Sequence, residues 1–157
     1  MFRHLSAVVV FVLGLYTLSV AAQTLDESLV EKPVATQEEI DAVLLIPAQQ
    51  NGISFIGGGV GVVERKALEQ WAKGYSLRIE MAAKSGSYLG DMRVRVFNAA
   101  GALVLDTLSD GPLLYVMLPE GHYKLDVSGL HPGEYATQSK TVKVLDGKQV
   151  RAFFAWP

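Results

Sequence analysis

The sequence predicts an all-β protein: a seven-stranded antiparallel β-sandwich that is preceded by a Gly-rich turn and one amphipathic helix. Three observations support this fold class. From residue 77 onward, apolar and polar residues alternate in short runs, which is typical of half-buried strands. Clusters of Gly, Pro, Asn and Asp separate these runs at intervals of about ten residues, as in β-sandwiches. No helical pattern follows residue 76, so crossover helices that would join parallel strands are not expected.

Seven runs have this alternating pattern, and each predicts one strand: residues 77–81, 92–96, 103–108, 113–118, 123–127, 136–145 and 149–156. The dipeptide Asp146-Gly147 separates the last two runs. Asp-Gly between alternating apolar runs is a strong signal for a two-residue hairpin turn. We therefore expect the last two strands to form a β-hairpin.

A helical period precedes the strands. Apolar residues recur at every fourth position from residue 63 to residue 75, and Gly74 is a typical C-terminal stop. We expect this helix to pack on the sandwich through four apolar side chains: Val63, Ala67, Leu68 and Trp71. Loss of a core aromatic side chain costs about 3 to 5 kcal/mol, and the sequence predicts this cost for Trp71→Ala.

The N-terminal residues have the pattern of a secretory signal. Arg3 precedes an apolar run over residues 5–20, and Val20-Ala21-Ala22 provides small residues for cleavage after Ala22. A retained membrane anchor is the alternative, but the run is shorter than the roughly 20 residues that span a bilayer. We therefore predict a periplasmic or secreted protein with no membrane span after signal cleavage.

The predicted organisation has four parts: a signal peptide (1–22), an acidic irregular leader (23–52), the Gly-rich turn with the helix (53–75) and the β-sandwich domain (76–157). Within the leader, Thr36 and Glu39 have the spacing of a capping box, which predicts a short helix over about residues 36–45. The formal net charge is −2 and the pI is about 5.9, which does not favour nucleic-acid binding. The chain has no Cys, so disulfides and thiolate metal sites are excluded.

Residues 53–80 imitate a dinucleotide-binding unit, with an apolar strand, a glycine cluster, a helix and a second strand. The G-x-G-x-x-G pattern fails, however, because Val62 and Glu64 stand where a third Gly is required. We therefore predict no cofactor. The glycines are interpreted instead as a tight bend before the helix.

The segment at residues 118–127 reads L-P-E-G-H-Y-K-L-D-V and resembles the L-P-x-G-x-Y-x-L-x-V signature of carboxypeptidase regulatory-like domains. Residues 90–101 resemble the preceding strand and turn of the same family. Residues 56–156 as a whole are similar to a group of small proteobacterial envelope proteins of unknown function. The resemblance implies a seven-stranded prealbumin-like, or transthyretin-like, sandwich, with Tyr123, Leu125 and Val127 facing the core. It implies no particular activity.

The sequence offers little catalytic chemistry. Ser109, Asp110 and His122 could form a triad only if the fold assembled them, and His122 lies on an alternating strand where a solvent-facing side chain is expected. His122 and His131 are too few for a metal site. Lys84 could serve an isopeptide bond, but the last strand contains no Asn. Paired carboxylates for glycoside hydrolysis stay open, although no acidic residue stands out. We therefore predict no catalytic and no metal-binding residues.

A binding role is the better hypothesis. We predict an exported, non-enzymatic binding or protein-interaction module of the cell envelope, whose partner is an envelope protein or a small ligand. Tyr88 lies in a loop at a sandwich end, where binding residues are common. Six candidate binding residues lie in this loop, the glycine cluster, the helix start and the turn at 110–112: Gly58, Gly59, Glu64, Arg65, Tyr88 and Asp110.

Three alternatives stay open for the function. The chain could be an accessory subunit of an envelope enzyme, or a small hydrolase, with a cleft near residues 57–65 and 110–112. It could also be a structural component of an envelope assembly, for which an uncovered edge strand would be evidence. Pairing of an edge strand with another chain is a second route to binding.

Overall fold

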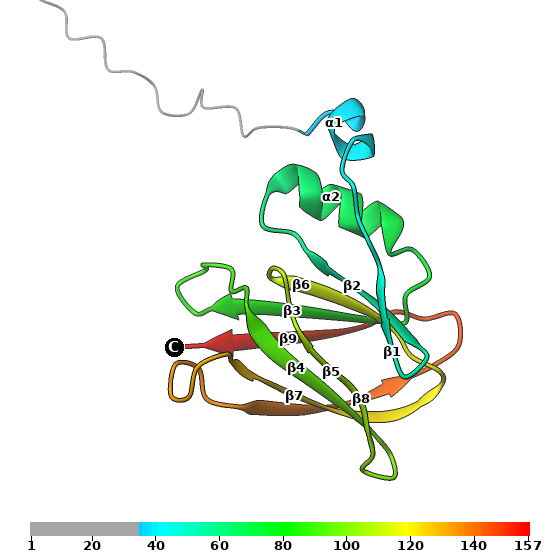
Figure 1. The fold of residues 1–157 in the computed structure, drawn as a ribbon, viewed down its shortest axis with the longest axis vertical. Coiled ribbons are helices and arrows are strands. Elements are labelled where there is room, and N and C mark those ends of the chain that lie inside the picture. Colours follow the sequence, from blue (N-terminus) through cyan, green and yellow to red (C-terminus); the bar gives the residue numbers. More distant parts are fainter. Residues whose placement is uncertain (1–34) are drawn as a thin grey trace, which may run out of the picture. The chain divides into compact units, whose positions relative to one another are not determined.

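The structure is a computed structural model, and it describes residues 35–157. The predicted signal peptide and residues 23–34 of the predicted leader lie outside the described residues. The described part is mostly β, with two sheets and two short helices (Figure 1), which confirms the predicted all-β class. No helix in residues 35–157 has the length and apolar character that a membrane span requires.

The elements follow in the order α1 (Gln37–Asp41), β1 (Ala48–Gln50), β2 (Ile53–Gly58), α2 (Val62–Trp71), β3 (Leu77–Ala83), β4 (Met92–Asn98), β5 (Leu103–Leu108), β6 (Leu113–Met117), β7 (Gly121–Gly129), β8 (Gln138–Val144) and β9 (Val150–Trp156). The first sheet has the strand order β1-β2-β6-β3-β9, and the second has the order β5-β4-β7-β8. Strands β3 to β9 correspond to the seven predicted runs.

Two strands, β1 and β2, were not among the predicted seven. Strand β2 pairs with β6 over most of its length, from Ser54 opposite Met117 to Gly58 opposite Leu113. The sequence pattern missed it because the run is short and ends in glycines, which are typical of a turn. The first sheet therefore includes residues from the predicted leader (23–52) and from the predicted turn and helix segment (53–75), which precede the predicted sandwich domain.

The expectation of purely antiparallel pairing is wrong at one strand pair. β3 and β9 run parallel, from Leu77 opposite Val150 to Ala83 opposite Trp156. These are the first and last of the predicted strands, so the intervening five strands connect them. Because the sandwich itself serves as the connection, this parallel pair needs no crossover helix.

The predicted hairpin at Asp146-Gly147 is also wrong. A tight turn is present, with the Lys148 N–H donating to the Leu145 carbonyl at 3.2 Å, but β8 belongs to the second sheet and β9 to the first. The connection over residues 145–149 crosses between the sheets. Turn chemistry fixes a local reversal of the chain, whereas the choice of strand partner depends on the whole sandwich.

The main core lies between the two sheets. Alternate residues of β3, β4, β7 and β9 are fully or almost fully buried there, and they include Phe154 and Trp156. Tyr123, Leu125 and Val127 are buried, as expected from the family signature. The Tyr123 hydroxyl donates to the Pro119 carbonyl at 3.0 Å, which satisfies its polar tip.

Helix α2 covers part of the outer face of the first sheet (Figure 1). A second apolar cluster joins them: Ile56, Leu68, Ala72, Tyr75, Leu113 and Tyr115. Trp71 is 53% exposed, so its predicted burial is wrong. A residue spacing of four turns the side-chain direction by about 40° at each step, because the helix has about 3.6 residues per turn. The four-residue repeat therefore drifts around the helix. The predicted burial of Ala67 and Leu68 is confirmed, and Ala72, not Trp71, joins Leu68 in the cluster against the sheet.

Helix α1 begins with the predicted capping box. The Glu39 N–H donates to the Thr36 hydroxyl at 3.3 Å, and the Thr36 N–H donates to the Glu39 carboxylate at 2.8 Å. The backbone hydrogen bond from Thr36 lowers the pKa of Glu39. The helix ends at Asp41, earlier than predicted.

Candidate functional site

The Gly-rich segment packs backbone against backbone on the turn that joins β5 and β6. A Cβ atom on Gly111 would lie 2.4 Å from the Gly58 carbonyl oxygen, and one on Gly57 would lie 3.5 Å from the Asp110 nitrogen. Gly58 and Gly111 are both buried. The predicted tight bend is present, with Gly59 at a φ of 87°. It brings the end of β2 and the start of α2 against the turn at residues 109–112.

Glu64 and Arg65, in the first turns of α2, close onto this glycine segment. The Glu64 carboxylate accepts a hydrogen bond from the Val60 N–H at 3.0 Å. The Arg65 guanidinium donates to the Gly59 carbonyl from Nε at 3.4 Å and from Nη2 at 3.3 Å. Gly61, the N-cap of α2, provides no side-chain cap, so the nearby Glu64 carboxylate also complements the positive end of the helix.

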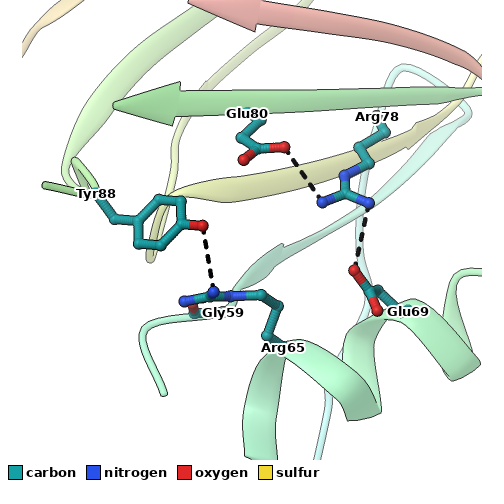
Figure 2. A network of polar contacts seen from close by, with 6 residues as sticks. All are labelled: Gly59, Arg65, Glu69, Arg78, Glu80 and Tyr88. Atoms are coloured by element: carbon teal, nitrogen blue, oxygen red, sulfur yellow. Dashed lines mark hydrogen bonds and ion pairs between the residues drawn. The ribbon is translucent and has the colours of Figure 1, made fainter. Parts of the chain in front are cut away.

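Arg65 also contacts Tyr88 (Figure 2). Its Nη1 donates to the Tyr88 hydroxyl at 3.3 Å, and its Cζ lies 4.2 Å from the centre of the Tyr88 ring. A guanidinium stacked on an aromatic face at this distance is a cation–π contact. Tyr88 is 46% exposed and forms a single bridge with Ala82 of β3. Arg65 therefore holds an exposed aromatic ring of the β3–β4 loop against the start of α2.

A second arginine, Arg78 of β3, lies on the same side of the sheet and was not predicted as a site residue. It bridges Glu69 of α2 at 3.3 Å and Glu80 of its own strand at 3.2 Å (Figure 2). Its side chain is only 13% exposed, and within residues 35–157 its buried Nε has no hydrogen-bond partner. Its Cζ lies 5.8 Å from the Tyr115 ring. Burial raises the pKa of Tyr115, although the positive charge of Arg78 opposes this.

The alternation of residues 77–81 predicts that Arg78 and Glu80 lie on the same face of the strand, opposite to the core. On a half-buried strand, charged residues at alternate positions are typical of a solvent-exposed face, so the pattern alone does not mark them as a site. Only the fold places Glu69 of α2 beside this strand. The pairing of Arg78 with Glu69 therefore depends on tertiary structure.

The structure brings five of the six predicted residues together: Gly58, Gly59, Glu64, Arg65 and Tyr88. Asp110 is adjacent through its backbone at Gly57, and its side chain is exposed. Within the described residues, no hydrogen bond or ion pair joins the Asp110 side chain to Glu64 or Arg65. The carboxylate and guanidinium of those two residues hold the glycine segment in place.

The outer face of the first sheet continues beyond α2 onto β9. Arg151 stands opposite Arg78 and Phe153 stands opposite Glu80, so all four side chains project from the same face. Phe153 is 51% exposed. We call this surface the open strip, and it consists of Arg78, Glu80, Tyr88, Arg151 and Phe153. It combines two exposed aromatic rings with the ion-paired Arg78 and Glu80 and with Arg151.

Of the residues considered for a catalytic triad, Ser109 and Asp110 lie in the turn beside the glycine segment, whereas His122 lies on a strand of the other sheet. Ser109 is buried, and its hydroxyl accepts a hydrogen bond from the Met92 N–H at 3.2 Å. His122 is exposed on β7 of the second sheet, and His131 is exposed in the loop that follows β7. Among residues 35–157, no group of three or more His, Asp or Glu side chains could hold a metal ion.

The fold and the site define a two-sheet β-sandwich that carries one helix and a charged, partly aromatic strip on the outer face of one sheet. No family model matches the chain, and the comparisons with curated proteins and with solved structures returned no match.

Proposed function

We propose that this protein is an exported, non-enzymatic interaction module of the cell envelope, and that it binds a partner protein through the open strip. One observation supports the proposal most strongly: the exposed rings of Tyr88 and Phe153 lie on the same side of the first sheet as two arginines with fixed contacts. Arg65 stacks on Tyr88, and Arg78 forms an ion pair with Glu69. Aromatic and arginine side chains contribute most of the binding energy in many protein interfaces.

The order of the strip favours binding. Arg65 fixes the Tyr88 ring, and Glu69 and Glu80 fix Arg78. Side chains that are already ordered lose less conformational entropy when a partner binds, so more of the contact energy appears as affinity.

Binding by strand addition has less support. Gln138 and Lys140 of β8 donate hydrogen bonds to backbone carbonyls of β9. At the opposite side of the sandwich, Gln50 and Asn51 bond to the backbone of β5. Side chains that occupy the backbone groups of edge strands reduce their capacity to pair with another chain. These contacts favour a partner that binds side chains over a structural component of an envelope assembly that pairs through an edge strand.

Two further parts of the proposal rest mainly on the sequence. Export rests on the signal pattern of residues 1–22. The prealbumin-like form of the sandwich rests on the resemblance at residues 118–127, and the two-sheet arrangement of the described strands is consistent with it. An enzyme or enzyme-accessory role has weaker support, because Glu64 and Arg65 bond to the glycine segment.

The test is affinity capture from an envelope extract, with the immobilised chain from residue 23 onward. The variant Tyr88→Ala/Phe153→Ser removes both exposed rings of the open strip. The matched control, Leu103→Ser/Leu108→Ser, removes two comparably exposed apolar side chains from β5 of the second sheet. Circular dichroism melts establish that both variants fold.

We expect one or more partner proteins to be retained by the wild type and by the control, with at least about tenfold less retained by the strip variant, a loss of about 1.4 kcal/mol or more. Equal retention by all three chains would contradict the assignment to the open strip. If the wild type retains no protein, the proposal of a stable protein partner is wrong.

A further inference from the structure

The outer face of the second sheet carries four cationic side chains and two carboxylates, although the formal net charge of the chain is −2. Arg95 of β4 stands opposite Asp106 of β5 on one side and Asp126 of β7 on the other. Residues two apart on a strand share a face, and so do directly opposite residues. We call this surface the cationic face, and its charged residues are Arg93, Arg95, Asp106, Lys124, Asp126 and Lys143.

The two carboxylates of the cationic face are already engaged. Asp106 accepts two hydrogen bonds from Arg93, at 2.8 and 2.6 Å. Asp126 is buried and accepts from the Ser139 hydroxyl at 2.6 Å and from Lys124 at 3.0 Å. Arg93 and Lys124 are therefore each paired with a carboxylate of the same face.

We call Arg95 and Lys143 the surplus cations, because the face has four cations for two carboxylates and, in the part of the chain that the structure describes, neither residue hydrogen-bonds a carboxylate. The charge of Arg95 still lowers the pKa of both Asp106 and Asp126. Within residues 35–157 neither forms an ion pair. Lys143 stands opposite His122 across β7 and β8, so no carboxylate occupies its directly opposite position. The cationic face thus presents the Arg95 guanidinium and the Lys143 ammonium to a negatively charged ligand.

A pocket of about 440 Å³ lies at one end of this face. Phe97, Lys124 and Thr141 form one row across β4, β7 and β8, and all three line the pocket together with His122. The β4–β5 turn at residues 98–101 contributes the remaining wall. The Lys124 ammonium lies 5.4 Å from the centre of the Phe97 ring. The pocket thus combines an aromatic surface with a hydroxyl, an imidazole and an ammonium group.

We propose that the cationic face binds an acidic saccharide. One sugar ring packs with its apolar C–H face near Phe97, and its hydroxyls bond to Thr141 and His122. Arg95 and Lys143 do not line the pocket, so they pair with carboxylates of neighbouring rings of the same saccharide. This combination of an apolar ring face, hydroxyls and negative charge is found in uronic-acid saccharides. An acidic peptide provides the charges but lacks the hydroxyl-bearing rings, and the negative net charge of the chain disfavours nucleic acid. The inference is independent of the proposed function, which uses the other sheet.

The probe is a hexamer of galacturonic acid, and binding to the purified protein is measured by isothermal titration calorimetry at low ionic strength. The neutral galactose hexamer and a short poly-L-glutamate are the comparison ligands. The variant Arg95→Gln/Lys143→Gln removes the surplus cations and leaves both paired carboxylates intact. The matched control, Lys66→Gln/Lys148→Gln, removes two exposed charges from α2 and from the β8–β9 turn.

We expect the wild type to bind the acidic hexamer at least about tenfold more tightly than either comparison ligand. The cationic-face variant should lose about tenfold or more in affinity, while the control stays within about twofold, and added salt should weaken binding. Phe97→Ala should also weaken binding of the hexamer. Equal affinity for poly-L-glutamate, equal losses in the two variants, or no binding by the wild type would each overturn the proposal.

Discussion

A Cβ atom added to Gly111 would lie 2.4 Å from the carbonyl oxygen of Gly58 and 3.0 Å from its Cα. The two glycines therefore form a backbone contact that no other residue pair could reproduce without displacement. This contact joins the β5–β6 turn to the last residue of β2. Because α2 begins four residues after Gly58, the contact also sets the position of Glu64 and Arg65.

Gly111→Ala should destabilise the protein by about 2 to 3 kcal/mol, because the atoms it meets are backbone atoms and overpacked sites relax poorly. Gly57→Ala is the matched control. Its new Cβ would meet its nearest neighbours at 3.5 Å, which is ordinary contact, so we expect a change within about 0.5 kcal/mol. Urea unfolding measures both, and equal effects at the two positions would contradict the tight contact.

Leu68 and Trp71 should differ strongly in their contribution to stability. Leu68 is fully buried between α2 and the first sheet, so Leu68→Ala should cost about 2 to 5 kcal/mol. Trp71 is 53% exposed and lines a pocket beside α1, so Trp71→Ala should cost about 1 to 2 kcal/mol. Chemical denaturation of both variants checks the corrected orientation of α2. A larger loss for Trp71→Ala than for Leu68→Ala would restore the orientation expected from the sequence.

Features that depend on neighbouring residues were predictable from the sequence. The capping box of Thr36 and Glu39 is local, and the seven alternating runs became β3 to β9 because their period matches a half-buried strand. Strand partners were not predictable in this way. The pairing of β3 with β9 and the separation of β8 from β9 are decided by packing of the entire sandwich.

The candidate site divides in the same way. Gly58, Gly59, Glu64 and Arg65 are close in sequence, so their proximity in space follows from a tight bend before a helix. Tyr88 was proposed from its place in a loop at a sandwich end. Arg78 was missed, because its partner Glu69 lies on α2 and only the docking of that helix on the first sheet brings the two together.

Asp126 should make stability depend on pH in the acidic range. Burial raises the pKa of Asp126, but hydrogen bonds from Ser139 and Lys124 and the charges of Lys124 and Arg95 outweigh it and lower the pKa overall. A carboxyl whose pKa is lower in the folded state stabilises the protein above its unfolded pKa of about 3.9, and this contribution is lost as pH falls below that value.

Asp126→Asn should therefore lower the free energy of unfolding by about 1 to 2 kcal/mol at pH 7. The loss is modest because Lys124 is partly exposed and solvent screens the ion pair. The loss should be smaller at pH 3. Urea unfolding at both values measures the difference. Asp146→Asn, in an exposed turn, is the control and should change stability by no more than about 0.5 kcal/mol at either pH. The linkage to Asp126 is wrong if the cost of Asp126→Asn is the same at both pH values.

The contact between β8 and β9 should protect the protein from self-association. The Gln138 side chain donates to the Ala155 carbonyl at 2.7 Å, and the Lys140 ammonium donates to the Phe153 carbonyl. These are backbone groups of an edge strand that could otherwise accept hydrogen bonds from another chain. Gln138→Ala/Lys140→Ala frees them, with a loss of about 1 to 3 kcal/mol in stability for two hydrogen bonds.

We expect this double variant to self-associate at concentrations where the wild type does not, as measured by sedimentation velocity and by light scattering during storage at 37 °C. Thr141→Ala/Lys143→Ala is the matched control, since it truncates two exposed side chains of the same strand that do not bond to β9. It should behave like the wild type. The prediction is wrong if the control associates as readily as Gln138→Ala/Lys140→Ala, or if Gln138→Ala/Lys140→Ala sediments like the wild type. In either case the Gln138 and Lys140 side chains do not prevent association through β9.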